Sequence, residues 1–156
     1  MTFRHTVKKP DIKKVRKILE STKFFHTAEI KIAEDLVLDG TIPGSDYHFF
    51  FAEIDKKVVG FTCYGPIACT LSSFDLYWIA VSSLVQGQGI GRDILKVTEN
   101  AIKKLGGTRI YIETSAKDLY KPTRGFYIAQ GYAEASILKD FYAPGDDKIT
   151  YVKVLE

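Results

Sequence analysis

The chain has 156 residues, a length that suits one domain with a substantial core. Hydrophobic residues make up 46% of the sequence and charged residues 26%, and these values exclude a disordered, collagen-like or coiled-coil protein. The net charge of +3 combines two unlike segments, because residues 1–31 hold nine Lys/Arg and three Asp/Glu, whereas residues 32–156 hold thirteen and sixteen. We therefore expect a single globular domain over residues 1–156.

Membrane, secretory and metal-binding classes lack their sequence signals. The sequence has no apolar run of about 18 residues and no apolar signal segment at its start. Cys63 and Cys69 are too few for a disulfide framework or a zinc site, and three scattered histidines have no metal-ligand spacing. We expect a cytoplasmic protein with free thiols, no membrane partner and no metal ion.

Residues 1–64 predict a strand, two helices and a β-hairpin. Pro10-Asp11 starts a helix whose apolar residues recur at helical spacing, namely Ile12, Val15, Ile18 and Leu19. Asp55-Lys56-Lys57 separates two runs rich in aromatic and β-branched residues, as a hairpin turn does. The expected ranges are a strand at 2–7, helices from 11 and at 26–38, and strands at 47–54 and 58–64.

The remainder predicts strands that alternate with helices. A buried strand at 74–81 precedes a helix at 89–105, whose apolar positions include Leu105. The later elements are a strand at 109–114, a helix at 122–130 and strands near 132–141 and 148–155. Alternation with helices requires parallel pairing and hairpins require antiparallel pairing, so we expect a mixed α/β sheet with helices on both faces.

A glycine-rich turn joins the strand at 74–81 to the next helix, with the sequence QGQGIGR at residues 86–92. Glycines allow positive φ and close approach of a ligand, and the free N–H groups of a helix start form an anion site. A P-loop requires Gly-Lys-Ser/Thr, and a dinucleotide fingerprint requires a small residue where Arg92 stands, so neither pattern fits. A glycine-rich connection without a ligand is the alternative.

Gln86-x-x-Gly89-x-Gly91 resembles the Q/R-x-x-G-x-G/A signature of the GNAT superfamily of acetyl-CoA-dependent N-acetyltransferases. Residues 126–132 (FYIAQGY) resemble the F/L-Y-x-x-x-G-F/Y segment of that family, one strand and one helix later, as the family has it. FDLYWIAV, ETS and DFYAPGDDK are similar to a subgroup of small prokaryotic members. The resemblance covers most of residues 47–156. It implies a mixed, mainly antiparallel sheet of about seven strands with four flanking helices, in which the parallel strands at 74–81 and 109–114 splay apart.

The resemblance implies acetyl-CoA as cosubstrate, with its pyrophosphate on the glycine-rich turn and its pantetheine arm along the strand at 79–81. The implied cofactor-binding residues are Ile79, Ala80, Val81, Gln86, Gly87, Gln88, Gly89, Ile90, Gly91, Arg92, Thr114, Tyr120, Thr123, Phe126 and Tyr127. Tyr120 stands where many members have Asn, which leaves a hydroxyl of Tyr120 or Thr123 as the substitute contact. Arg124 is a further candidate for a CoA phosphate.

Acetyl transfer to an amine requires a base, stabilisation of an oxyanion and an acid for the leaving thiolate. The resemblance implies that Tyr127 is the acid and that the oxyanion lies near the amide of Ala80 or Val81; an amphipathic core tyrosine is the alternative for Tyr127. Asp75, where histone-type members place a catalytic Glu, is the first candidate base, and an acid at a strand edge that caps a turn is the alternative for it. Glu113 is the second candidate base, and many members use a water chain or backbone carbonyls instead. Strand alternation predicts that Asp75, Tyr77, Ile79 and Val81 share one face.

The resemblance implies an acceptor opposite CoA, between the first two helices and the loop that joins the last two strands, where aromatic and acidic residues suit an amine. The candidate substrate-binding residues are Phe24, Phe25, Tyr77, Asp140 and Tyr142. Core packing for the two phenylalanines and a polar hairpin for residues 140–147 are the alternatives.

Two other function classes compete with the enzyme. A non-catalytic CoA-binding sensor would use the same fold, although retention of Tyr127 disfavours it. A nucleic-acid-binding module would use the basic first helix, but its lysines are spread around the helix, as on a solvated surface. We expect acetyl-CoA and an amine-bearing acceptor as partners, no nucleic acid, and leave a homodimer open because dimers are common in the family.

Overall fold

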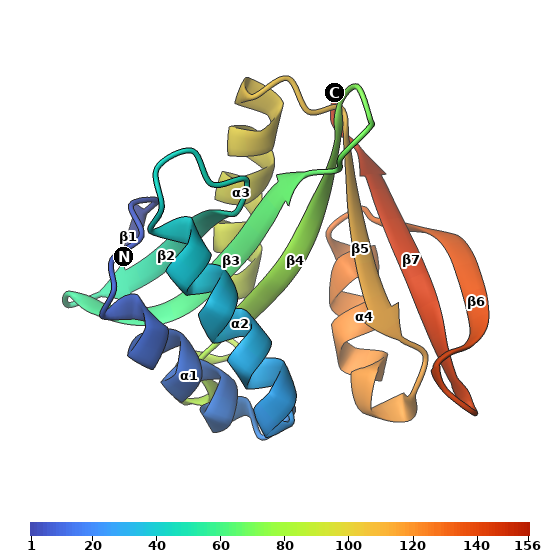
Figure 1. The fold of residues 1–156 in the computed structure, drawn as a ribbon. Coiled ribbons are helices and arrows are strands. Elements are labelled where there is room, and N and C mark those ends of the chain that lie inside the picture. The colour runs from blue at the N-terminus through green and yellow to red at the C-terminus, as the bar shows by residue number, and fades with distance from the viewer. The chain divides into compact units, whose positions relative to one another are not determined.

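The computed structural model describes all 156 residues (Figure 1). Its elements are β1 (Thr2–Arg4), α1 (Asp11–Thr22), α2 (Thr27–Gly40), β2 (His48–Ile54), β3 (Lys57–Pro66), β4 (Ser73–Val81), η1 (Ser83–Val85), α3 (Ile90–Lys104), β5 (Arg109–Ser115), η2 (Asp118–Tyr120), α4 (Lys121–Ala129), β6 (Ala133–Ala143) and β7 (Asp146–Val154). Every expected helix and strand is present, and only the short 3-10 helices η1 and η2 were not expected.

The seven strands are hydrogen-bonded in the order β1-β2-β3-β4-β5-β7-β6. β4 and β5 pair in parallel, since α3 connects them, whereas β1-β2, β2-β3, β5-β7 and β6-β7 are antiparallel. The expected mixed, mainly antiparallel sheet with four α-helices is therefore confirmed.

The chain divides into two compact units. The N-terminal unit comprises Met1–Gly65 and Leu76–Ala101, and the C-terminal unit comprises Pro66–Asp75 and Ile102–Glu156. β4 therefore contributes Ser73–Asp75 to the C-terminal unit and its remaining residues to the N-terminal unit. No helix of the structure combines the length and the apolar character needed to cross a membrane.

The N-terminal unit buries apolar side chains on both faces of its strands. On one face, α1 and α2 pack against β2 and β3, and the cluster includes Val15, Leu19, Val37, Phe49, Phe51 and Phe61. On the other face, Ile90 and Ile94 of α3 pack with Ala52, Ile79 and Val81. Figure 1 shows α2 in front of these strands and α3 behind them.

Two details of this packing differ from the expectations. Leu105, the last apolar position of the expected helix, is 57% exposed because α3 ends at Lys104. Tyr77 does not share a face with Ile79 and Val81, because its ring contacts Tyr47, which packs against the α1–α2 cluster, at a centroid distance of 5.4 Å. Strict alternation therefore breaks in the middle of β4.

The hairpin turn between β2 and β3 is tighter than expected. Asp55 and Lys56 have positive φ values of 48° and 64°, and Lys57 already pairs with Ile54. Two consecutive residues with positive φ form the turn type that matches the twist of two antiparallel strands. This geometry explains why Lys57 belongs to β3.

A buried carboxylate ties β1 to the start of α1. The Asp11 side chain is fully buried and accepts hydrogen bonds from the Arg4 guanidinium, the Lys8 N–H and the Lys14 ammonium. Burial alone would raise the pKa of Asp11, but these donors and the charge of Arg4 outweigh it and hold the pKa below its usual value. Arg4 also binds Glu53 of β2 at 2.8 Å, so it connects β1, β2 and the start of α1; β1 ends at Arg4, three residues before the expected end at residue 7.

Asp11→Asn should lower the free energy of unfolding at pH 7 by about 1–3 kcal/mol, because it removes a charged acceptor from several donors. A carboxyl group whose pKa is depressed by folding stabilises the protein above its unfolded pKa, and that stability is lost as the pH falls through the folded pKa. Denaturant unfolding of the two proteins between pH 7 and pH 2 should thus converge at the acid end. A constant difference across this range would contradict the assignment.

Candidate active site

The glycine-rich turn of the N-terminal unit has a backbone that only glycine adopts readily. Gly87 and Gly89 have φ values of +79° and +80°, in the region that L side chains rarely occupy. The Gln86 side-chain amide donates to the Val81 carbonyl oxygen at 3.0 Å and holds the turn against the end of β4. The turn has a defined geometry that leads directly into α3.

The start of α3 offers N–H groups without intrahelical acceptors. The first helical hydrogen bond runs from the Asp93 N–H to the Gly89 carbonyl oxygen at 3.0 Å, so the N–H groups of Ile90, Gly91 and Arg92 precede it. These groups, with the helix dipole, favour an anion. A Cβ built on Gly87 would meet no atom within 4 Å, so the backbone there is open to a ligand.

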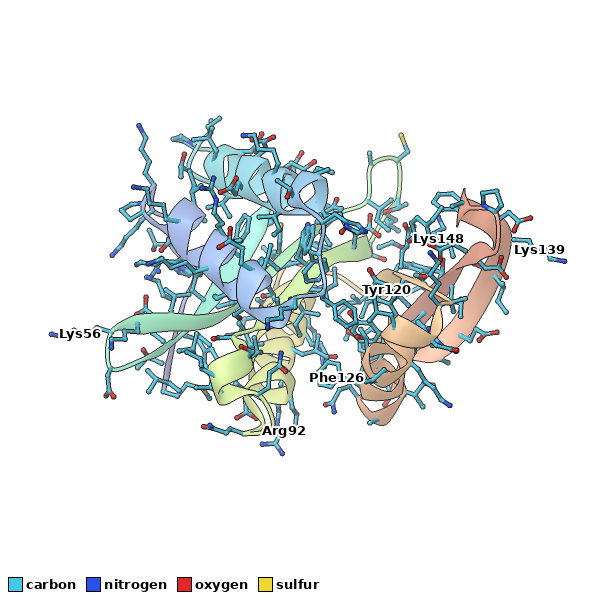
Figure 2. The ribbon with its side chains drawn as sticks, turned by 90° about the horizontal axis from the view of Figure 1, so that it is seen from below. Lys56, Arg92, Tyr120, Phe126, Lys139 and Lys148 are labelled. Atoms are coloured by element: carbon cyan, nitrogen blue, oxygen red, sulfur yellow. The ribbon has the colours of Figure 1, made fainter.

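Arg92 adds a cation beside this turn. A Cβ built on Gly89 would lie 3.1 Å from the Arg92 guanidinium, and the Arg92 Nε donates to the Asp93 carboxylate at 3.0 Å. The side chain is well exposed and extends from the start of α3 in Figure 2. The turn, its N–H groups and Arg92 together fit a phosphate or pyrophosphate group.

In the C-terminal unit, three charged side chains share one face of the sheet. Asp75 of β4 pairs with Tyr111 of β5 in parallel register, which places Glu113, two residues later, on the same face as Asp75. β5 and β7 pair Glu113 with Thr150 and Ser115 with Lys148, which puts Lys148 on that face too. The Lys148 Nζ lies 3.3 Å from the Glu113 Oε1.

The neighbours of Asp75 alter its proton affinity. Burial raises the pKa of the Asp75 carboxyl above its usual value, and the negative charge of Glu113 raises it further, whereas Lys148 acts in the opposite direction. A carboxyl with a raised pKa accepts a proton more readily than a free aspartate. The structure thus brings together the two candidate bases, Asp75 and Glu113, and adds a cation beside them.

Sequence reasoning missed Lys148. Its side chain is only 11% exposed, and its ammonium lies 3.9 Å from the centre of the Phe141 ring. A buried lysine is uncommon unless it is paired, and here the partners are Glu113 and an aromatic ring. No local motif marks this residue; only the register of β7 against β5 shows that it faces Glu113.

Tyr127 lies on the opposite face of the sheet in the C-terminal unit. The tyrosine is 6% exposed, and its ring contacts the rings of Phe126, Tyr132 and Tyr151. Tyr151 alternates with Thr150 along β7, so it points away from the face that carries Lys148 and Glu113. Burial raises the pKa of Tyr127, which keeps its phenol protonated.

The β6–β7 hairpin contains two expected acceptor-binding residues, Tyr142 and Asp140. Tyr142 lies near the charged face, which is the face of the sheet that carries Asp75, Glu113 and Lys148, and Asp140 shapes the turn. Tyr142 is 47% exposed, and its partial burial, with the charges of Glu113 and Asp146 and with Tyr120, raises its pKa to about 12. Asp140 has a φ of +53°, and its carboxylate accepts the Gly145 N–H at 2.7 Å. The structure therefore gives Asp140 a role in the hairpin backbone.

The remaining cofactor-binding candidates of the C-terminal unit lie on α4 and on the elements that precede it in the chain. Thr114 is buried on β5, Tyr120 ends η2, and Thr123 and Phe126 lie partly buried on α4. Arg124 donates to the carbonyl oxygens of Ser115 and Lys117 at 2.9 and 2.8 Å. Its guanidinium thus fixes the loop after β5, and the contact of Arg124 with a CoA phosphate stays a prediction.

In the N-terminal unit, Phe25 lines an open pocket between α1 and α2. The Phe25 ring contacts those of Phe24 and Trp78 at centroid distances of 5.8 and 5.2 Å. The pocket has a volume of about 530 Å³ and is also lined by Arg16, Glu20, Ile30, Lys31 and Glu34. Core packing and pocket lining are thus both roles of Phe25.

The structure places no group of three or more His, Cys, Asp or Glu side chains where it could hold a metal ion.

Comparison with known structures supports the GNAT resemblance. A crystal structure of a Desulfovibrio desulfuricans protein assigned to the GNAT acetyltransferase family is 40% identical, covers 98% of either chain and has a TM-score of 0.95. The crystal structure of aminoglycoside 6'-N-acetyltransferase complexed with coenzyme A has a TM-score of 0.78 over 99% of this chain and 97% of that one. At 16% identity, the second match shows similarity of fold alone.

Sequence comparison points the same way. An uncharacterised N-acetyltransferase of Methanocaldococcus jannaschii is 31% identical over 110 residues, which are 67% of this chain and 65% of that protein. The chain spans less than two thirds of the length of the curated relatives that it matches. The model of the acetyltransferase (GNAT) domain family matches residues 45–134, more than half of the chain. With the expected turn, strand order and α4 tyrosine all in place, the chain belongs to the GNAT family of acetyltransferases.

Proposed function

We propose that residues 1–156 form one GNAT domain that transfers an acetyl group from acetyl-CoA to the primary amine of a small molecule or peptide. The observation that carries the proposal is the turn at residues 86–92, where two glycines with positive φ lead into free N–H groups of α3. This is the donor arrangement that a pyrophosphate requires. A cytoplasmic location stays a prediction from the sequence, and a homodimer stays open.

The turn residues have distinct proposed roles in holding CoA. The N–H groups of Ile90, Gly91 and Arg92 would bind the pyrophosphate oxygens, and the Arg92 guanidinium would add charge. The backbone of Ile79–Val81 would pair with the pantetheine arm, as an added strand does. Among the remaining candidates, Thr114, Tyr120, Thr123 and Phe126 would line the arm's path.

When bound, acetyl-CoA supplies a thioester whose C–S bond breaks as the acceptor nitrogen forms its N–C bond. The Asp75 carboxylate would accept the proton that the amine nitrogen loses, and Glu113 is the second candidate for this role. The Tyr127 O–H would donate its proton to the leaving sulfur, and solvent would restore both groups. An amide of Ala80 or Val81 would stabilise the carbonyl oxygen.

The placement of the two proton-transfer groups suits these separate tasks. Asp75 and Tyr127 lie on opposite faces of the sheet in the C-terminal unit, so neither can readily exchange its proton directly with the other. A base for the amine and an acid for the thiolate act on different reacting atoms and need no mutual contact. The alternative assignment of Tyr127 as a core tyrosine predicts no effect of its hydroxyl on turnover.

The acceptor is proposed to carry an amine near aromatic groups. In the C-terminal unit, the aromatic ring of Tyr142 beside the carboxylates of Glu113 and Asp146 favours an acceptor that carries an amine. In the N-terminal unit, the candidate acceptor-binding residues are Phe24, Phe25 and Tyr77. Incubation with acetyl-CoA and a panel of amines, amino acids, polyamines and peptides, with thiol release as readout, tests the activity. Binding of CoA without turnover on the panel would favour a non-catalytic sensor, and absence of CoA binding at micromolar concentration would overturn both assignments.

Gly89→Ala should weaken CoA binding about tenfold, because an L side chain at a φ of +80° costs about 1–2 kcal/mol and disturbs the N–H groups of the turn. Isothermal titration with CoA measures the change. Gly44→Ala is the matched control, since Gly44 has a φ of +82° with no atom near its Cβ position. Equal CoA affinity in wild type and Gly89→Ala would argue against the turn as the pyrophosphate site.

Tyr127→Phe should lower kcat about 100-fold with CoA affinity nearly unchanged, because it removes only the proposed acid and keeps the ring packing. Tyr151→Phe removes the hydroxyl of a neighbouring buried tyrosine and should retain wild-type kcat. Steady-state kinetics and CoA titration of both variants provide the test. Wild-type kcat in Tyr127→Phe would assign Tyr127 to the core.

Asp75→Asn should lower kcat at least about 100-fold while the free energy of unfolding and CoA affinity stay near wild type. In the wild type, kcat/KM should fall as the pH drops through the raised pKa of Asp75, because the protonated carboxyl cannot accept a proton. Asp55→Asn, in the exposed β2–β3 turn, is the control. An unchanged kcat in Asp75→Asn, with loss in Glu113→Gln, would transfer the role of base to Glu113.

A further inference from the structure

The charged face of the C-terminal unit poses an electrostatic problem. Asp75 and Glu113 occupy adjacent parallel strands on the same face, and their negative charges interact. Two nearby carboxylates disfavour ionisation of one of them, and partial burial of Asp75 adds to this effect. A protonated Asp75 could not accept a proton from an amine.

Lys148 is placed to reduce that repulsion. Its ammonium lies 3.3 Å from the Glu113 carboxylate, and the Phe141 ring 3.9 Å away on β6 contacts the same ammonium. Figure 2 shows Lys148 among the strands of this unit, whereas Lys139 of β6 extends away from them into solvent. A lysine that only contributed to solubility would keep its ammonium in water, as Lys139 does.

We propose that Lys148 is a positioning residue of the acetyl-transfer site, whose ammonium, held between Glu113 and Phe141, allows Asp75 to remain a carboxylate beside Glu113. The inference rests on the proposed function and extends it by naming the residue that sets the working protonation state of the base. Lys148 itself contacts no reacting atom in this scheme.

Other titratable groups of the C-terminal unit act less directly on Asp75. Asp146 is engaged by the Ser115 hydroxyl and by Lys117, whose Nζ lies 3.5 Å away. The groups at this face from the surrounding elements are Tyr111 and Glu113 on β5, Tyr120 on η2, Tyr142 on β6, and Asp146 and Lys148 on β7. Lys148 is the cation that acts on Asp75, so its removal has a predictable sign.

Carbon-13 NMR titration of the Asp75 carboxyl tests the inference without any turnover. Lys148→Met should raise the midpoint of the Asp75 titration by about one pH unit, because it removes the opposite charge that acts on this carboxyl. Glu113→Gln should lower it, because it removes a negative neighbour. Lys148→Arg should restore the wild-type midpoint, and Lys139→Met, which changes an exposed lysine, should leave it unchanged.

Lys148→Met and Glu113→Gln should shift the Asp75 titration in opposite directions. A general loss of stability could not produce opposite shifts of that midpoint. If Lys148→Met does not fold, Lys148→Gln, which also lacks the cation, takes its place with the same expected shift. An unmoved Asp75 midpoint in folded Lys148→Met, or a downward shift, would overturn the inference. Wild-type behaviour of every variant would likewise assign Lys148 to packing.

The pH dependence of kcat/KM links the titration to catalysis. In Lys148→Met, the acid limb should move about one unit to higher pH, with kcat at high pH close to wild type. If no acceptor on the panel is acetylated, the proposed function fails while the NMR titration still tests the role of Lys148. If turnover is present and its acid limb does not move, Lys148 does not set the protonation state of the base.

Discussion

The parallel pairing of β4 with β5 is the constraint on which the charged face depends. The register of Asp75 with Tyr111 places Glu113 on the same side as Asp75, and the antiparallel pairing of β5 with β7 then brings Lys148 to that side. A shift of one residue in either register would turn one of these side chains to the opposite face. The chemistry proposed for this face therefore depends on two strand registers, because these decide whether Asp75, Glu113 and Lys148 lie on the same side of the sheet.

The charge pattern of the sequence has a local explanation in the structure. The turn at residues 86–92, whose proposed ligand is an anion, lies in the acidic part of the chain. The net charge of that part therefore cannot attract the ligand. Backbone N–H groups at the start of α3 and the Arg92 guanidinium supply the positive potential at that point. In the basic segment, Arg4 and Arg16 form ion pairs with Asp11 and Glu34, which is a structural use of positive charge and gives no support to a nucleic-acid surface.

Local signals predicted the elements well because they are properties of short segments. The glycine turn, the helix start at Asp11 and the hairpin near Asp55 each depend on the backbone preference of a few residues. Errors arose where packing or register overruled a periodic pattern. Leu105 lies beyond the last turn of α3 and is exposed, and β4 breaks its alternation so that Tyr77 meets Tyr47.

The sequence alone determined the family, the element order, the mixed sheet and the candidate acid, base and anion-binding turn, because these are encoded in motifs and in hydrophobic periodicity. Tertiary structure decided which of the named residues meet. It placed Asp75 beside Glu113, turned Tyr127 to the opposite face and used Asp140 and Arg124 to hold backbone. Lys148 emerged only at this level, since Lys148 and Glu113 are 35 positions apart in the sequence and meet only through the pairing of β5 with β7, which no local pattern records.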